Sequence, residues 1–238
     1  MGRTKDIEGC IKQWGVQKAG ITRIPVTNEE VEDCMALIAE IGRRYCENFV
    51  IDDNNRFVFE QIIRWMLADP NAQAHDTEGN IIPAGLSKGL YIAGRTGTGK
   101  TLLLAVFSVF AKLLGIEYWS YGKKLPLDFN FYRADLICDD YAKEGDLQKF
   151  KQMPILCVED LGCEEPETLF MGNRKNVLRS ILEARGDKRS LLTFATSNIR
   201  IDRLGKNKEG RELYGDRVQS RAFEMWNYYI LGGKDRRK

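Results

Sequence analysis

The residues best suited to do chemistry form one glycine-rich segment, Gly94-Arg95-Thr96-Gly97-Thr98-Gly99-Lys100-Thr101, which fits the pattern G-x-x-x-x-G-K-[ST]. Glycines in such a loop let successive backbone N–H groups turn inward around phosphate oxygens. Lys100 would place a positive charge on the β and γ oxygens of a nucleoside triphosphate, and the Thr101 hydroxyl would ligate Mg²⁺. The segment therefore predicts a site for ATP together with Mg²⁺.

Hydrolysis would need carboxylates near the metal and a group that orients the attacking water. Glu159 and Asp160 directly follow the apolar run 154–158. Because adjacent residues at a strand end point in different directions, one carboxylate can face the metal while the other faces the water. Asn198 follows the apolar run 191–196 and would hold this water or contact the γ-phosphate, although an Asx turn after a strand is the alternative.

Positive charge for the transition state is expected from Arg217 or Arg221, which are four residues apart and would share one helical face. Solvated helix charges are the competing interpretation of this pair. An arginine finger supplied to a neighbouring subunit would require an oligomer with each ATP held at an interface.

The elements that position these groups alternate between strands and helices. Apolar runs predict strands at 89–93, 154–158 and 191–196, with an apolar helix at 101–114 and an amphipathic helix at about 173–185 that ends at Gly186 and keeps Arg185 largely outward. The aromatic segments 116–121 and 129–132 form either a hairpin or one core strand with an insertion. The fold class is therefore α/β, a P-loop NTPase three-layer sandwich with a parallel sheet and ligands at the carboxyl ends of its strands.

A small N-terminal helical region precedes this sheet. Thr27 and Glu30 have the spacing of a capping box for a helix at about 28–47, and a second amphipathic helix ends at Asp69-Pro70. Residues 71–88 are expected to be a loop. We therefore divide the chain into a helical partner-binding or lead-in region at 1–70, an ATPase domain at 71–231 and a basic tail at 232–238, and core packing is the favoured role of the apolar helix faces.

Composition sets broad limits on the function. The chain has 238 residues, 43% of them apolar, and a net charge of only +2, so charge alone neither requires nor excludes nucleic acid. Six scattered cysteines and one histidine do not form a zinc motif. Without a signal-peptide core or a run of about 20 apolar residues, we expect a cytoplasmic protein with free thiols and no membrane contact.

Taken together, four segments resemble the DnaC/IstB branch of AAA+ ATPases: the glycine loop 94–101, residues 159–164, residues 196–198 and residues 214–221. The resemblance covers roughly residues 88–231. It implies Walker A roles for Lys100 and Thr101, a Walker B pair at Glu159 and Asp160, a first sensor at Asn198, and Arg221 as the finger with Arg217 beside it. It also implies an AAA+ core without a full helical lid.

One departure concerns the Walker B pair, which in this branch usually begins with aspartate, whereas here the longer carboxylate comes first. Asp160 would then be one methylene shorter as a water activator. Slow hydrolysis, or a switch that mainly senses bound ATP, is the resulting hypothesis.

The resemblance also implies partners: a replicative helicase loaded onto single-stranded DNA, or a transposase for the IstB-like alternative, with the chain acting in a homo-oligomer or mixed ring. A nucleotide-gated adaptor with little hydrolysis is a third possibility. Single-stranded DNA would bind at Lys123 and Lys124, next to Tyr118, Trp119 and Tyr121, since basic groups and stacking rings suit it. A surface turn explains these residues equally well. A second basic patch, Arg174, Lys175 and Arg179, has a solvated helix face as its alternative.

Overall fold

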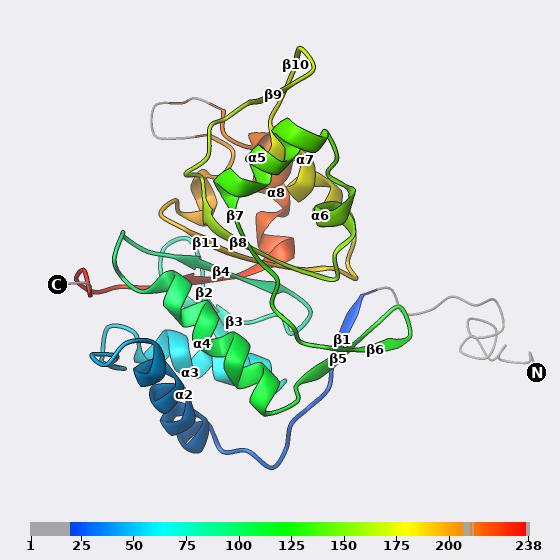
Figure 1. The fold of residues 1–238 in the computed structure, drawn as a ribbon. Helices are drawn as coiled ribbons and strands as arrows, with labels where there is room; N and C mark the ends of the chain where they lie inside the picture. The colour runs from blue at the N-terminus through cyan, green and yellow to red at the C-terminus, as the bar shows by residue number, and fades with distance from the viewer. Residues whose placement is uncertain (1–19, 207–209, 211, 237–238) are drawn as a thin grey trace, which may run out of the picture.

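The computed structural model describes residues 20–206, 210 and 212–236, and its centre is a seven-stranded sheet in the order β3-β2-β12-β4-β11-β8-β7 (Figure 1). The strands are β2 (Gln73–His75), β3 (Ile81–Pro83), β4 (Gly89–Ala93), β7 (Phe131–Arg133), β8 (Ile155–Leu161), β11 (Leu192–Ser197) and β12 (Trp226–Ile230). Neighbours from β12 to β7 pair in parallel, whereas β2 and β3 form an antiparallel edge. Every residue of β4 and β11 is buried, as expected for strands covered on both faces.

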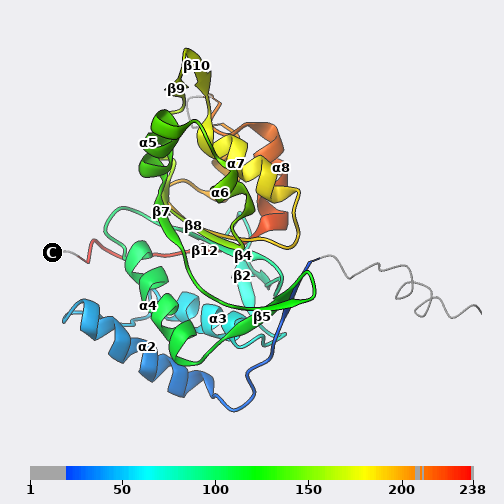
Figure 2. The same ribbon diagram turned by 45° about the vertical axis from the view of Figure 1, so that its right-hand side comes forward.

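Helices cover both faces and complete three layers (Figures 1 and 2). One face carries α2 (Val31–Tyr45), α3 (Arg56–Met66) and α4 (Lys100–Leu113), which share one hydrophobic core with the sheet. The other face carries α5 (Ala134–Glu144), α6 (Gln148–Gln152), α7 (Val177–Gly186) and α8 (Gly215–Met225), together with the short 3-10 helix η1 (Ile201–Arg203). The predicted α/β three-layer fold is confirmed.

The predicted N-terminal helices are present, and their apolar faces enter the core. Ile38 of α2 and Ile62 of α3 are fully buried in the same cluster as Phe107 of α4. The predicted capping box between Thr27 and Glu30 is absent. The N-cap residue of helix α2 is Glu30, and its side chain makes no capping hydrogen bond. The domain boundary at residue 70 stays a prediction.

Three other expectations about local structure need correction. Residues 71–88 contain the hairpin β2–β3 rather than only a loop, because the edge of the sheet offers backbone partners to this polar segment. The helix predicted from 173 begins at Val177, where the Asn176 side chain accepts a bond from the Arg179 N–H, and it includes Gly186. The residues before it, β10 (Asn173–Lys175), pair with β9 (Thr168–Phe170).

The predicted position of Arg185 also needs correction, because its side chain is buried rather than directed outward. Its guanidinium donates to the carbonyls of Phe150, Met153 and Leu192 and to the Thr193 hydroxyl. Arg185 follows Ile181 by four residues and so lies on the inward face of α7, and these bonds satisfy the charge that is buried there.

The two aromatic segments form strands of two different sheets. β5 (Glu117–Ser120) and β6 (Lys123–Pro126) form a hairpin that joins β1 (Ile21–Arg23) in a small antiparallel sheet, while β7 is a core strand beside β8. The second alternative, a core strand with an insertion, is therefore correct. No helix in the described part of the chain is both long and apolar enough to cross a bilayer.

Candidate nucleotide site

The glycine loop connects β4 to α4, so its backbone N–H groups lie at the N-terminus of a 14-residue helix. Gly97 and Gly99 have φ of 83° and 92°, a conformation that side chains disfavour. At Gly97 a Cβ would also lie 2.1 Å from the Asp235 carboxylate. The sequence pattern and the backbone conformation therefore agree.

Lys100 is the first residue of α4 and is only 6% exposed. Its Nζ donates to the carbonyls of Gly94 and Arg95, at 3.0 and 3.1 Å, and to Oδ1 of Asn198 at 2.7 Å. Asn198 follows β11, the strand next to β4, so the sheet brings together two residues 98 positions apart. The ammonium group is thus held where the loop would receive phosphate oxygens.

The carboxylate pair lies in β8 at an irregularity of the sheet. Asp160 has a φ of 53°, and the pairing of β8 with β11 shifts register around Thr196, whose hydroxyl accepts the Asp160 N–H at 3.0 Å. Val158 and Leu161 both pack into the core on the α5–α7 side. Because two residues between them share the opposite side at such a bulge, Glu159 and Asp160 both belong to the α4 side. The expectation that one carboxylate faces the metal and the other faces the water stays a prediction.

Their surroundings differ. Asp160 lines the cavity next to the glycine loop, whereas Glu159 does not and sits beside Arg133 of β7 in the strand register. Burial and the neighbouring charge of Asp160 raise the pKa of Glu159, and Arg133 opposes this shift. The structure therefore presents Asp160, not the longer Glu159, to the cavity.

The cavity has a volume of about 770 Å³. Its walls come from the glycine loop, Thr101, Asp160, Cys163 and Asn198, and from the segment after α2 that includes Phe49 and Val50. Thr101 and Asp160 supply the oxygen donors that Mg²⁺ prefers, and the helix N-terminus suits phosphates. The residues present therefore fit a magnesium–nucleotide complex.

The C-terminal segment forms another part of this cavity, which the sequence did not reveal. The Arg236 N–H donates to the Gly97 carbonyl at 3.0 Å, and its guanidinium contacts both Asp52 carboxylate oxygens at 2.9 Å. Residues 232–236 were expected only to belong to a basic tail. No local pattern announces a contact between positions 184 apart in the chain.

Arg217 and Arg221 share one face of α8, as their spacing predicts, but neither lines the cavity. Both are paired with Asp187, Arg217 at 3.1 Å and Arg221 at closer range. Within one subunit they therefore hold α8 to the end of α7. Their assignment as fingers stays a prediction.

Lys123 and Lys124 lie on β6, in the hairpin that follows the C-terminal end of α4, whereas the glycine loop precedes the N-terminal end of that helix (Figure 1). Lys124 pairs with Glu117, and Trp119 and Tyr121 are exposed, but Tyr118 is fully buried and cannot stack on a base. In the second patch, Arg179 is paired with Glu183 and Glu212. DNA binding at either place stays a prediction.

Comparison with known proteins gives the family context. No protein-family model matches the chain. The replicative helicase loader DnaI of Bacillus subtilis (strain 168) is 29% identical over 159 residues, which are 64% of this chain and 49% of that protein. The chain thus spans about half the length of the curated relative it matches.

Two solved structures share the fold. A crystal structure of DnaI has a TM-score of 0.51 at 21% identity, covering 83% of this chain and 92% of that one. A Streptococcus pyogenes serotype M3 protein described as a primosome component has a TM-score of 0.51 at 20% identity, covering 84% and 98%. The resemblance to DnaC-like AAA+ ATPases is confirmed. In this fold the glycine loop, Asp160 and Asn198 meet at the carboxyl ends of parallel strands, where such sheets bind ligands.

Proposed function

We propose that the chain is a nucleotide-gated helicase loader of the DNA-replication machinery, which binds ATP with Mg²⁺ at the cavity beside the glycine loop. The observation that carries the nucleotide part is the position of Lys100, held at 2.7 Å from Asn198 next to the loop's backbone N–H groups. The partner is proposed from the similarity to DnaI, a replicative helicase loader.

Within this proposal, Lys100 binds the β- and γ-phosphates and Asn198 contacts the γ-phosphate once the lysine turns toward it. Thr101 and Asp160 hold Mg²⁺, which when bound neutralises charge on the transferring phosphoryl group. Hydrolysis is completed by Arg221 or Arg217 of a neighbouring subunit in a ring. Single-stranded DNA and a replicative helicase are the proposed macromolecular partners, in the cytoplasm.

The proposal is tested by co-purification of the tagged chain from its host with ATP and with a slowly hydrolysed ATP analogue. A hexameric replicative helicase should copurify with the wild-type chain and with Lys112→Ala, which removes an exposed lysine from the other end of α4. The helicase should not copurify with the Lys100→Ala variant. Recovery of a transposase in place of the helicase would favour the IstB-like alternative and contradict the proposal.

A second measurement separates an ATPase from an adaptor. ATP turnover should fall at least about tenfold in Asp160→Asn, because Asp160 is the carboxylate that lines the cavity. If wild type and Asp160→Asn are equally slow while Lys100→Ala abolishes partner binding, the nucleotide acts only as a gate and hydrolysis is not part of the function.

A further inference from the structure

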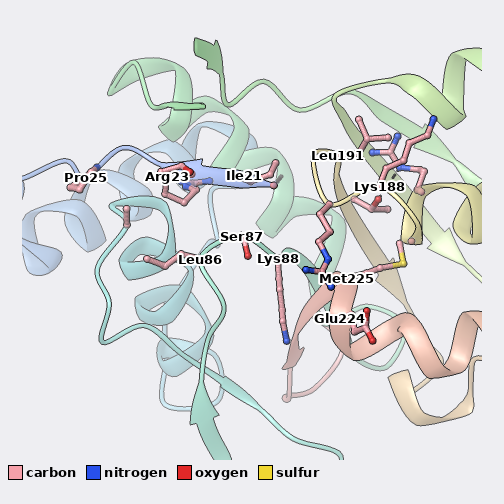
Figure 3. A pocket seen from close by; sticks show the side chains of 17 residues that line it. Ile21, Arg23, Pro25, Leu86, Ser87, Lys88, Lys188, Leu191, Glu224 and Met225 are labelled. Carbon is pink, nitrogen blue, oxygen red and sulfur yellow. Dashed lines mark hydrogen bonds between the residues drawn. The ribbon is translucent and has the colours of Figure 1, made fainter. Parts of the chain in front are cut away.

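A second cavity, of about 690 Å³, lies at the end of the central strands opposite to the end that carries the glycine loop. Figure 3 shows this cavity and side chains that line it. Lys88 precedes β4, Leu191 precedes β11 and Met225 precedes β12, so the cavity opens at the amino ends of these strands. Residues of β1 form its facing wall. It shares no residue with the nucleotide cavity.

The charges around this second cavity are strongly unbalanced. Its lining includes five basic side chains, namely Arg23, Lys88, Arg185, Lys188 and Arg189. Glu224, at the end of α8, is the one carboxylate among the lining residues. A concave surface with one sign of charge concentrates the potential that attracts ions of the other sign.

Arg23 is the informative member of this group, because it is buried and incompletely bonded. Its side chain is 7% exposed, one nitrogen donates to the Met66 carbonyl at 2.8 Å, and the guanidinium lies 4.1 Å above the Trp65 ring. Its Nε and Nη1 atoms are buried and have no hydrogen-bond partner within the described residues. Burial lowers its pKa to about 10.

Such an arrangement is costly as it stands. A buried donor without a partner loses its hydration without compensation, and a buried cation loses more. Arg185, whose partners within the described part of the chain are the carbonyls given above and the Thr193 hydroxyl, has no carboxylate among them. Arg185 is satisfied by its carbonyl and hydroxyl partners, so Arg23 is the lining guanidinium that lacks acceptors, and an oxyanion in the cavity would supply both acceptors and negative charge.

We propose that this cavity is a second anion site that takes a phosphate group, with Arg23 as the buried donor and Lys88, Lys188 and Arg189 as the rim. Several dispersed cations suit a multiply charged oxyanion, and guanidinium groups are effective phosphate donors. The phosphate belongs either to the backbone of a nucleic acid or to a free phosphate compound. Occupancy of the nucleotide cavity is not required.

The adjoining surface is compatible with a nucleic-acid source. β1 pairs with β5, so that Arg23 lies opposite Tyr118 and Thr22 lies opposite the exposed Trp119. The Ser120 hydroxyl also donates to the Ser190 carbonyl, which ties the β5–β6 hairpin to the loop that carries Lys188 and Arg189. A strand held by its phosphate in the cavity would thus have an aromatic ring and basic residues of the hairpin within reach.

The test uses the full chain with Lys100→Ala in every sample, so that the glycine loop contributes little to the measured binding of phosphate probes. Two probes, pyrophosphate and a short single-stranded oligonucleotide, are titrated calorimetrically and by fluorescence anisotropy. Arg23→Lys should weaken binding about tenfold or more, since it removes the donors that lack partners. Lys88→Gln, at the rim, removes a charge whose Nζ also donates to the Phe223 carbonyl, and it should weaken binding about threefold.

Two controls make the result specific. Lys143→Gln removes an exposed lysine of α5 far from the cavity and should leave both affinities unchanged. Glu224→Gln removes the opposing carboxylate and should tighten binding about twofold to threefold. Binding of pyrophosphate alone identifies a free phosphate compound, and tighter binding of the oligonucleotide identifies a nucleic-acid backbone.

The proposal is overturned if Arg23→Lys and Lys88→Gln, both folded by circular dichroism, bind both probes as tightly as Lys143→Gln does. Binding of a Glu-rich peptide with neither phosphate probe bound would also overturn it, because the cavity would then serve an acidic protein segment.

Discussion

Replacing Glu159 by glutamine should make the protein more stable and less active at the same time. The Glu159 carboxylate is half-buried beside Asp160, and burial and this like charge raise its pKa, while Arg133 partly offsets them. The folded state therefore disfavours the ionised form. One pKa unit corresponds to about 1.4 kcal/mol, and solvent screening of a half-exposed group reduces the effect to below about 1 kcal/mol. For a chain of this size the melting temperature should rise by roughly 1–3 °C at pH 7.5.

The pH dependence has a definite sign. An acid whose pKa is higher in the folded than in the unfolded state destabilises the fold fully above the folded pKa and not at all below the unfolded one. The gain from Glu159→Gln should thus be complete at pH 7.5. It should shrink as the pH falls through the raised pKa of Glu159 and vanish near the ordinary glutamate value of about 4.3.

Thermal unfolding followed by circular dichroism at several pH values measures this gain, and ATP turnover with Mg²⁺ measures the functional loss. Glu144→Gln, at the exposed end of α5, is the matched control and should change neither. A lower melting temperature for Glu159→Gln at pH 7.5, or an equal gain at all pH values, would refute the reasoning. Unchanged turnover would instead remove Glu159 from the reaction while leaving the electrostatic argument intact.

Three further changes test other parts of the structure. Gly97→Ala should reduce ATP affinity at least about tenfold, because it requires a strained φ and displaces Asp235; unaltered affinity in an equilibrium titration would contradict this. Arg185→Met leaves three carbonyls without their donor and should lower the free energy of unfolding by about 3–5 kcal/mol in urea titrations; a loss under 1 kcal/mol would show that water replaces the guanidinium. Arg221→Ala should keep ATP binding but lose turnover, and mixing it with Lys100→Ala should restore part of that turnover if the arginine acts on a neighbouring subunit; no recovery would count against a shared site.

The parts of the fold that local patterns describe were predictable from the sequence. The segments of the buried strands β4 and β11 are recognisable as apolar runs. The helix after the glycine loop is apolar on most of its surface, which predicts that other elements of the protein bury it. Parallel pairing then places Asn198 at the same edge as Lys100. The position of these two residues thus follows from strand order alone.

The remaining features depend on contacts that sequence periodicity does not encode. The charge of Arg185 favours an outward position, although the residue follows Ile181 by four on the inward face of α7; the carbonyls that accept its hydrogen bonds lie in two distant segments, α6 with its C-cap and β11. Arg236 joins the nucleotide cavity through Asp52, far away along the chain. The short strands β2 and β10 form because a neighbouring backbone is present, which no run of side chains announces.

The order of the two carboxylates illustrates how one backbone detail changes a chemical inference. In a regular strand, the first residue of the pair would face the glycine loop and the second would point away, so Glu159 would be the metal ligand. The bulge at Asp160 brings the second residue to the same side and into the cavity. An aspartate therefore stands near Thr101 despite the reversed order, with Glu159 held back beside Arg133. The argument for slow hydrolysis then depends on the reach of Glu159 toward water, and not on the absence of an aspartate from the metal position.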